Sequence, residues 1–341
     1  MTKGAETAIE TVDLDRFVDG TNRDGVARQV ARSCEEIGFI IVSGDVLPND
    51  LLRRAFAASR AFFDLPQATK AQFAPTVKGQ QRGYHGVATR NLARTTGQDA
   101  PPDLRESVFL GPIDDHNAYF ADLADARSAY AVNILPKIPT GIDATLIALY
   151  RAFERLTSDV FRVFACALAL PEDFFADKMQ RHFSIMACHH YPPQHEPPQP
   201  GQLRAGAHTD FGAMTILAMT DALGGLEART ADGRWTPVTA RPGKLVINIG
   251  DLMARWTNDR WRSTLHRVVN PSGLNMANSE RQSIGFFVHP DYDAPVACIS
   301  SCLAQGETPR YPPVTAGHHI KIKIDRSHTS AGTQGDTTHA G

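Results

Sequence analysis

The tripeptide His208-Thr209-Asp210 decides the expected fold and chemistry, because it places an imidazole and a carboxylate two residues apart, directly before the strand-like run 214–219 (MTILAM). Side chains two residues apart in an extended chain point to the same face, so these two groups are expected to meet at one point. His266 lies far downstream in another strand-like stretch and supplies a second imidazole. Two imidazoles and one carboxylate on one side of an ion leave open positions opposite, which is typical of non-haem Fe(II) sites that react with O2.

Arg281 and Ser283 repeat the same two-residue spacing at the start of a strand-like run that continues to Val288. On one face of a strand, a guanidinium beside a hydroxyl makes a fork that can hold a carboxylate through charge-assisted hydrogen bonds. The sequence therefore predicts a metal site accompanied by a carboxylate-binding pair.

Short strand-like runs separated by Gly, Pro, Asn and Asp dominate the chain from about residue 183 onward. Several short strands at such intervals are typical of a sandwich, a jelly roll or a barrel. The clearest runs are 214–219, 244–249, 266–269 and 283–288. We therefore expect a mainly β fold with flanking helices.

Helical periodicity is concentrated in the first half of the chain. Apolar residues at helical spacing predict helices over 26–37, 48–65 and 142–168, and the run 39–42 (FIIV) predicts a buried strand. The Gly- and Arg-rich segment 74–106 and the Pro-rich segment 192–204 are expected to be loops. We divide the chain into a helix-rich N-terminal region 8–120, a long supporting helix within 121–180, a core region 181–325 and a disordered polar tail 326–341.

The composition excludes several classes of function. The 341 residues carry 35 Lys and Arg against 37 Asp and Glu, a net charge of −2, so neither a nucleic-acid nor an anionic-membrane partner is expected. No apolar stretch reaches the length of a membrane span and the first residues are too polar for a signal peptide, which predicts a cytoplasmic protein. The five scattered cysteines are expected to be free thiols, and a monomer is the expected state.

The sequence resembles the isopenicillin N synthase-like group of 2-oxoglutarate and Fe(II)-dependent dioxygenases over about residues 8–325. Beyond the residues already named, short motifs spread along the chain carry this resemblance. They are Glu36-Ile37-Gly38-Phe39, Phe62-Phe63 before Leu65-Pro66, Arg82-Gly83-Tyr84, Gly224-Gly225-Leu226-Glu227, Trp235-Thr236-Pro237-Val238, Pro242-Gly243, Asn248-Ile249-Gly250-Asp251, Trp256-Thr257-Asn258 and His266-Arg267-Val268. The resemblance implies a double-stranded β-helix, or jelly roll, and an oxidoreductase role in specialised metabolism.

The resemblance also assigns roles to the metal and carboxylate pairs. It implies that His208, Asp210 and His266 hold Fe(II), which places the iron and 2-oxoglutarate site in region 181–325. It implies that Arg281 and Ser283 anchor the far carboxylate of 2-oxoglutarate.

Tyr191, before Pro192, matches a family tyrosine that reaches the co-substrate, although His189 stands where the family has Asn. Substrate contacts are expected from Arg82, Tyr84 and Phe287. The other histidines near the motifs are expected to be ordinary polar or core residues: His182, His189, His190, His195 and His289. Asn248, Gly250 and Asp251 are expected to shape a turn.

The implied reaction uses O2 to convert 2-oxoglutarate to succinate and CO2 and removes hydrogen from a small-molecule substrate. Hydroxylation is the expected outcome, with desaturation or ring formation set by how the substrate is held. Two alternatives stay open: an Fe(II) and O2 oxidase of the isopenicillin N synthase type that uses no 2-oxoglutarate, and a non-catalytic jelly-roll binding module.

The substrate itself cannot be identified from the sequence. The segment 74–106 contains four arginines, Arg82, Arg90, Arg94 and Arg105, which permits the hypothesis of a carboxylated or otherwise anionic substrate.

Overall fold

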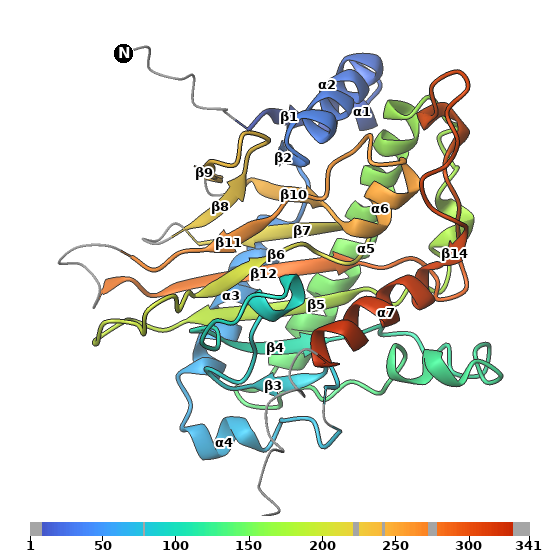
Figure 1. The fold of residues 1–341 in the computed structure, drawn as a ribbon. Coiled ribbons are helices and arrows are strands. Elements are labelled where there is room, and N and C mark those ends of the chain that lie inside the picture. Colours follow the sequence, from blue (N-terminus) through green and yellow to red (C-terminus); the bar gives the residue numbers. More distant parts are fainter. Residues whose placement is uncertain (1–8, 78, 221–224, 241–242, 272–277, 330–341) are drawn as a thin grey trace, which may run out of the picture.

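Two β-sheets face one another in a computed structural model that describes residues 9–77, 79–220, 225–240, 243–271 and 278–329 (Figure 1). The larger sheet has eight strands in the order β1 (Thr11–Asp13), β2 (Phe39–Ser43), β10 (Leu245–Ile249), β7 (Met214–Met219), β12 (Arg281–Val288), β5 (Ile185–Tyr191), β4 (Glu106–Leu110) and β3 (Gly83–His85). The smaller sheet has the order β6 (Ala205–His208), β11 (His266–Val268), β8 (Leu226–Arg229) and β9 (Trp235–Pro237). Except for the parallel pair β1–β2, the neighbouring strands in both sheets run antiparallel. This is the mainly β jelly-roll architecture that the sequence predicts.

Seven α-helices of the described residues surround these sheets, and a small third sheet pairs β13 (Pro295–Val296) with β14 (Val314–Thr315). The helices are α1 (Asp15–Val18), α2 (Arg23–Glu36), α3 (Asn49–Phe63), α4 (Gln67–Ala71), α5 (Ile142–Ala167), α6 (Asp251–Trp256) and α7 (Ala316–Thr329). Figure 1 shows α5, in green, crossing behind the strands of the larger sheet. None of the helices in the described part of the chain combines the length and apolar character needed to cross a bilayer.

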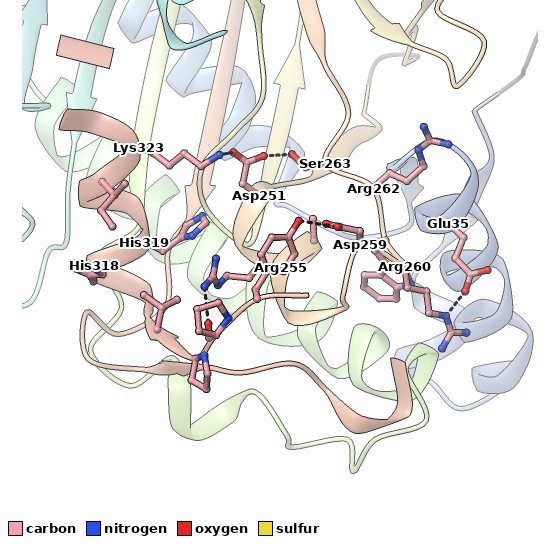
Figure 2. Close-up of a pocket in the computed structure, with 17 residues that line it drawn as sticks. Glu35, Asp251, Arg255, Asp259, Arg260, Arg262, Ser263, His318, His319 and Lys323 are labelled. Carbon is pink, nitrogen blue, oxygen red and sulfur yellow. Dashed lines mark hydrogen bonds and ion pairs between the residues drawn. The ribbon is translucent and has the colours of Figure 1, made fainter. Parts of the chain in front are cut away.

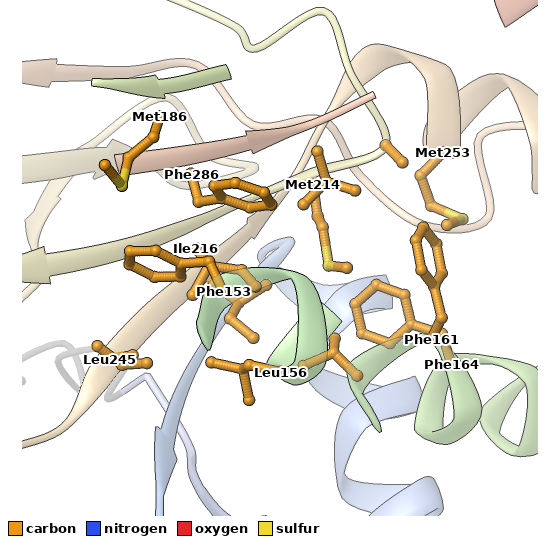
Figure 3. Close-up of a cluster of buried hydrophobic side chains, with 14 of the residues drawn as sticks. Phe153, Leu156, Phe161, Phe164, Met186, Met214, Ile216, Leu245, Met253 and Phe286 are labelled. Carbon is orange, nitrogen blue, oxygen red and sulfur yellow. The ribbon is translucent and has the colours of Figure 1, made fainter. Parts of the chain in front are cut away.

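Helix α5 covers one face of the larger sheet because its apolar residues span a wide arc of the helix. Figure 3 shows the contact, in which side chains of α5 meet side chains of β5, β7, β10 and β12. Phe153 of α5 and Phe286 of β12 are fully buried, with stacked rings whose centroids are 5.2 Å apart. The strands are thereby fixed with one face turned toward the helix.

The opposite face of the larger sheet looks toward the smaller sheet. In β12, Ile284, Phe286 and Val288 belong to the core under α5, so alternation turns Arg281 and Ser283 to the space between the sheets. A second apolar cluster lies between the sheets, with residues from both sheets and their connections. Its members are Ile37, Phe39, Ile41, Tyr191, Ala205, Leu226, Ala228, Val238, Val246 and Val268.

The strongly periodic segments fold as predicted. The helices expected over 26–37, 48–65 and 142–168 are α2, α3 and α5, and the strand expected over 39–42 is β2. The N-terminal region 8–120 also supplies β1, β3 and β4, so strands from both halves of the chain build the larger sheet.

Two predictions need correction. Segment 74–106 is not a continuous loop, because it contains β3 and a 3-10 helix over Ala93–Thr96; a three-residue strand is too short to carry a readable period. The predicted disordered tail begins too early, because α7 continues to Thr329; a helix already nucleated extends at little cost. Residues 330–341, together with Gly224, Pro242 and residues 272–277, lie outside the described part of the chain.

The packing of α5 against the sheet yields a stability prediction. Phe153→Ala is expected to lower the free energy of unfolding by about 3–5 kcal/mol, because it opens a cavity beneath Phe286. Urea unfolding of the metal-free protein, followed by circular dichroism, measures the change. Val132→Ala is the control, since Val132 is 82% exposed and its change should stay within about 0.5 kcal/mol. A loss below about 1 kcal/mol for Phe153→Ala would contradict the packing described.

Candidate metal centre

Three side chains converge between the two sheets. His208 ends β6, Asp210 follows two residues later, and His266 begins β11 directly opposite His208 in the pairing register. One nitrogen or oxygen atom of each lies within 4.8 Å of the others, and Nε2 of His208 and of His266 lie 3.7 and 3.8 Å from the carboxylate oxygens of Asp210. A single ion between them can contact all three residues.

Hydrogen bonds to the backbone fix which ring nitrogen of each histidine faces the centre. In His208, Nδ1 lies 2.8 Å from the carbonyl oxygen of Gly206. In His266, Nδ1 lies 2.9 Å from the carbonyl oxygen of Thr264. A carbonyl oxygen only accepts, so Nδ1 donates in both residues and Nε2 is the ring nitrogen that faces Asp210. Burial and the neighbouring His266 lower the pKa of His208 to about 3, which keeps this ligand neutral.

Asp210 is oriented by two neutral donors from the larger sheet. Asn248 Nδ2 and Thr215 Oγ1 donate to its Oδ2 over 2.8 and 2.5 Å. Burial works to raise the pKa of Asp210, but His266, His208 and these hydrogen bonds outweigh it and lower the pKa. The carboxylate therefore stays ionised, with a fixed direction toward the two imidazoles.

Asn248 thus has a different role from the turn-shaping one expected of it. It lies within β10, where alternation turns its amide toward the metal ligands while Ile247 and Ile249 face the core under α5. The sequence contains a signal for this role, namely an amide inside an otherwise apolar strand. A buried amide needs hydrogen-bond partners, so it is expected to contact other polar groups.

Asp251 anchors the loop that carries two of the ligands. Its backbone N–H donates to the carbonyl oxygen of Asp210 over 2.7 Å, and its carboxylate accepts from Thr209, Ser263 and Lys323. Figure 2 shows Asp251 between Ser263 and Lys323 at the edge of a cleft of about 930 Å³ lined by residues of α6 and α7. Helix α7 thereby supports the metal-ligand loop from outside the sandwich.

The predicted carboxylate-binding residues also come together. Arg281 pairs with Tyr191 in the register of β12 and β5, and its guanidinium lies 4.9 Å from the centroid of the Tyr191 ring. The Tyr191 hydroxyl is hydrogen-bonded to Ser283; burial works to raise its pKa, but Arg281 and Arg105 outweigh burial and lower it. Nη1 of Arg281 is buried and has no hydrogen-bond partner within the described protein, as expected of a group that holds a ligand.

His189 is a site residue that sequence reasoning missed. It pairs with Ser283 in the register and faces the same interior, where its Nδ1 lies 2.7 Å from Oγ of Ser107. Burial, reinforced by Arg105, holds its pKa well below the usual value, so the ring is neutral. Its neighbour His190 faces the other way and is structural as expected, since it bonds Glu106 and Glu280.

Phe287 faces the interior, and its contact with the substrate stays a prediction. It packs with three buried side chains of β4 and β5, namely Phe109, Ile185 and Ala187, and its ring centroid lies 6.4 Å from that of His189. An apolar wall therefore stands beside the polar centre.

The prediction that Arg82 and Tyr84 line the substrate space is wrong. Tyr84 pairs with Val108, which turns it to the helix-covered face, and its hydroxyl donates to Glu106 over 2.6 Å. Arg82 is 1% exposed and donates to the backbone carbonyls of Gln81, Ala129 and Ala131, so it holds a loop together.

Comparisons with known proteins agree with this geometry. The family model of the 2OG-Fe(II) oxygenase superfamily matches residues 182–290, and the model described as non-haem dioxygenase in morphine synthesis N-terminal matches residues 9–137. The chain is 33% identical to the 2-oxoglutarate-Fe(II) type oxidoreductase hxnY of Emericella nidulans, covering 96% of this chain and 92% of that protein.

Solved structures show the same architecture. The full-length Neurospora crassa T7H in complex with alpha-KG matches with a TM-score of 0.83 and 25% identity, over 96% of this chain and 98% of that one. A 2OG-Fe(II) oxygenase family protein from Caulobacter crescentus matches with a TM-score of 0.79 and 31% identity, over 93% and 98% of the two chains.

The hydrogen bonds to Asp210 predict an effect on metal affinity. Thr215→Val removes one donor to the carboxylate, and such losses around ligands lower metal affinity about 10- to 100-fold. Titration with Mn(II), followed by electron paramagnetic resonance, measures the dissociation constant without turnover.

Thr220→Val is the matched control for this titration, because Thr220 follows the same strand and its hydroxyl donates to the Gln282 carbonyl, away from the three ligands. The control should bind Mn(II) like the parent protein. Equal affinities for both variants would show that Thr215 does not orient Asp210.

Proposed function

Because the chain belongs to the 2OG-Fe(II) oxygenase superfamily, we propose that His208, Asp210 and His266 hold the Fe(II) of this enzyme. The observation that carries the proposal is the convergence of two imidazoles and one ionised carboxylate, each fixed by its own hydrogen bonds. This donor set suits Fe(II) and leaves one side of the ion open.

We further propose that Arg281, Ser283 and Tyr191 hold 2-oxoglutarate. The buried Nη1 of Arg281 without a partner fits a carboxylate of the co-substrate, and the hydroxyls of Ser283 and Tyr191 lie beside it. His189 lies on the same interior face, and its neutral ring is proposed to help position the co-substrate. In these terms region 181–325 carries the metal and co-substrate residues, and region 8–120 adds the β4 wall of the substrate space.

The enzyme is a 2-oxoglutarate-dependent oxygenase: bound Fe(II) and 2-oxoglutarate reduce O2, release succinate and CO2, and supply the oxidant for a small-molecule substrate. The protein orients the reactants and excludes water. The apolar cluster around Phe39 and Val246 lies between the two sheets, and Phe287 lines the wall beside the centre. Hydroxylation is the proposed outcome, with desaturation or ring closure if the substrate is held differently.

The two alternatives are less well supported. A non-catalytic module does not need three ligands that converge within 4.8 Å and are each oriented by a further hydrogen bond. An oxidase that uses no 2-oxoglutarate is disfavoured by relatives named 2-oxoglutarate-Fe(II) type oxidoreductases and by alpha-KG in the T7H complex.

The proposed setting is a monomer in the cytoplasm with no nucleic-acid or membrane partner. The near-equal numbers of cationic and acidic residues support the absence of such partners. All five cysteines are free, as is usual in a reducing compartment. Related enzymes named homoarginine-6-hydroxylase in Oryza sativa and proline hydroxylase in Petromyces alliaceus support a small-molecule substrate.

Arg281→Gln tests the co-substrate assignment. Loss of charge-assisted hydrogen bonds worth about 1.5–3 kcal/mol should weaken 2-oxoglutarate binding about 10- to 150-fold and leave Fe(II) binding unchanged. Anaerobic titration of the Fe(II)-loaded protein with 2-oxoglutarate, followed through the visible charge-transfer band of a chelated 2-oxo acid, measures the affinity.

Arg229→Gln, at the exposed end of β8, is the control for this titration and should behave like the parent protein. No band in the parent protein with Fe(II) shown to be bound would refute 2-oxoglutarate use. An unchanged affinity in Arg281→Gln would refute the role of this arginine.

A further inference from the structure

The four arginines in segment 82–105 have different surroundings. Arg82 is bound to backbone carbonyls and Arg94 is exposed on the surface. Arg90 and Arg105 instead extend into the interior beside the proposed co-substrate residues, as their contacts show. Only these two can act on a ligand at the metal centre.

Arg105 belongs to the interior face of the sandwich. It precedes β4, so alternation places it on the same side as Ser107 and Phe109. Its side chain is 9% exposed and hydrogen-bonds Tyr191, while its Nε is buried without a partner in the described structure. This guanidinium therefore has a buried donor that a ligand in the interior could satisfy.

Arg90 approaches the same place from the preceding loop. Its guanidinium lies 4.8 Å from the centroid of the Phe109 ring, and that ring lies 5.9 Å from the ring of His189. Burial and the positive charge of Arg105 lower the pKa of Arg90 to about 10, so Arg90 remains cationic at neutral pH. His85 adds a buried Nε2 without a partner, with its ring 5.1 Å from Phe109.

The charges in this part of the interior do not balance. In the described part of the chain, Asp103 is the carboxylate that faces both Arg90 and Arg105; it lies 3.6 Å from Nη2 of Arg105. Its two oxygens already accept backbone N–H groups of Gly206 and Leu92. Since the proposed 2-oxoglutarate accounts for Arg281, the pair Arg90 and Arg105 carries one positive charge more than Asp103 offsets, and a buried charge without a counter-charge is costly.

We infer that Arg90 and Arg105 bind a carboxylate of the primary substrate, so that this enzyme oxidises an organic acid whose apolar part lies against Phe109 and Phe287. The paired guanidinium groups suit a carboxylate because each can donate two parallel hydrogen bonds. The inference rests on the proposed function, since it takes the metal centre as the place of reaction.

The test uses matched pairs of compounds that differ in charge alone. Benzoate, phenylacetate and hexanoate, each with its primary amide, are added to the full chain loaded with Fe(II) and 2-oxoglutarate under anaerobic conditions. Perturbation of the visible charge-transfer band reports binding beside the metal, and succinate release in air reports stimulated turnover. At least one acid is expected to bind at least about tenfold more tightly than its amide.

Variants then assign the preference to the two arginines. Arg90→Gln and Arg105→Gln are expected to remove the preference for the acid. Arg90→Gln, which does not contact Tyr191, is expected to leave the affinity for 2-oxoglutarate within about twofold of the parent. Arg94→Gln, on the same segment but exposed, is the matched control and should retain the preference. If Arg105→Gln does not fold, as judged by thermal melting, Arg90→Gln and Arg90→Lys carry the assignment; the lysine keeps the charge and should retain part of the preference.

Three outcomes overturn the inference. They are equal or tighter binding of the amides, no response to any acid at millimolar concentration, or a loss of 2-oxoglutarate affinity in Arg90→Gln and Arg105→Gln as large as that in Arg281→Gln. All three leave the charge-transfer band of the parent protein intact, so the proposed function survives them. Absence of that band with Fe(II) bound would instead refute the proposed function.

Discussion

The burial of one face of the larger sheet under α5 is the interaction on which the rest of the structure depends. Because side chains alternate along a strand, Ile284 and Phe286 in the helix-covered core require Arg281 and Ser283 to face the opposite side. The same rule turns Asn248 and Thr215 toward Asp210. A slip of one residue in any of these strands would bury guanidinium and amide groups under the helix, so the apolar contact also fixes the register of the polar site.

The residues that could be predicted from the sequence are those whose relation is local. His208 with Asp210, and Arg281 with Ser283, needed only the two-residue period of a strand. The long helix α5 was readable from its own apolar arc. His266 lies opposite His208 through a long-range strand pairing. It was expected because a third ligand would complete the metal site and because of the family resemblance. Its spacing along the chain did not indicate it.

The residues that could not be predicted are those whose direction depends on a distant partner. Tyr84 faces α3 and α4 rather than the substrate space because a three-residue strand takes its register from β4. His189 and His190 are adjacent in sequence, yet one lies in the site and the other bonds Glu106 and Glu280 outside it. Likewise, nothing in the sequence separates Arg82 and Arg94 from Arg90 and Arg105, because the fold alone decides which loop arginine turns inward.

The interior is organised by charge as well as by shape. Around the metal ligands the protein supplies one negative charge, from Asp210, and burial together with the neighbouring His266 lowers the pKa of His208. Arg281, Arg105 and Arg90 give the neighbouring space a positive charge that Asp103 offsets only in part. An anion satisfies these buried guanidinium groups, whereas a neutral molecule leaves them unpaired. The positive charge of this space therefore favours anionic ligands over neutral ones. In the proposed binding mode the apolar wall therefore contacts the apolar part of the substrate, and Arg90 and Arg105 bind its carboxylate.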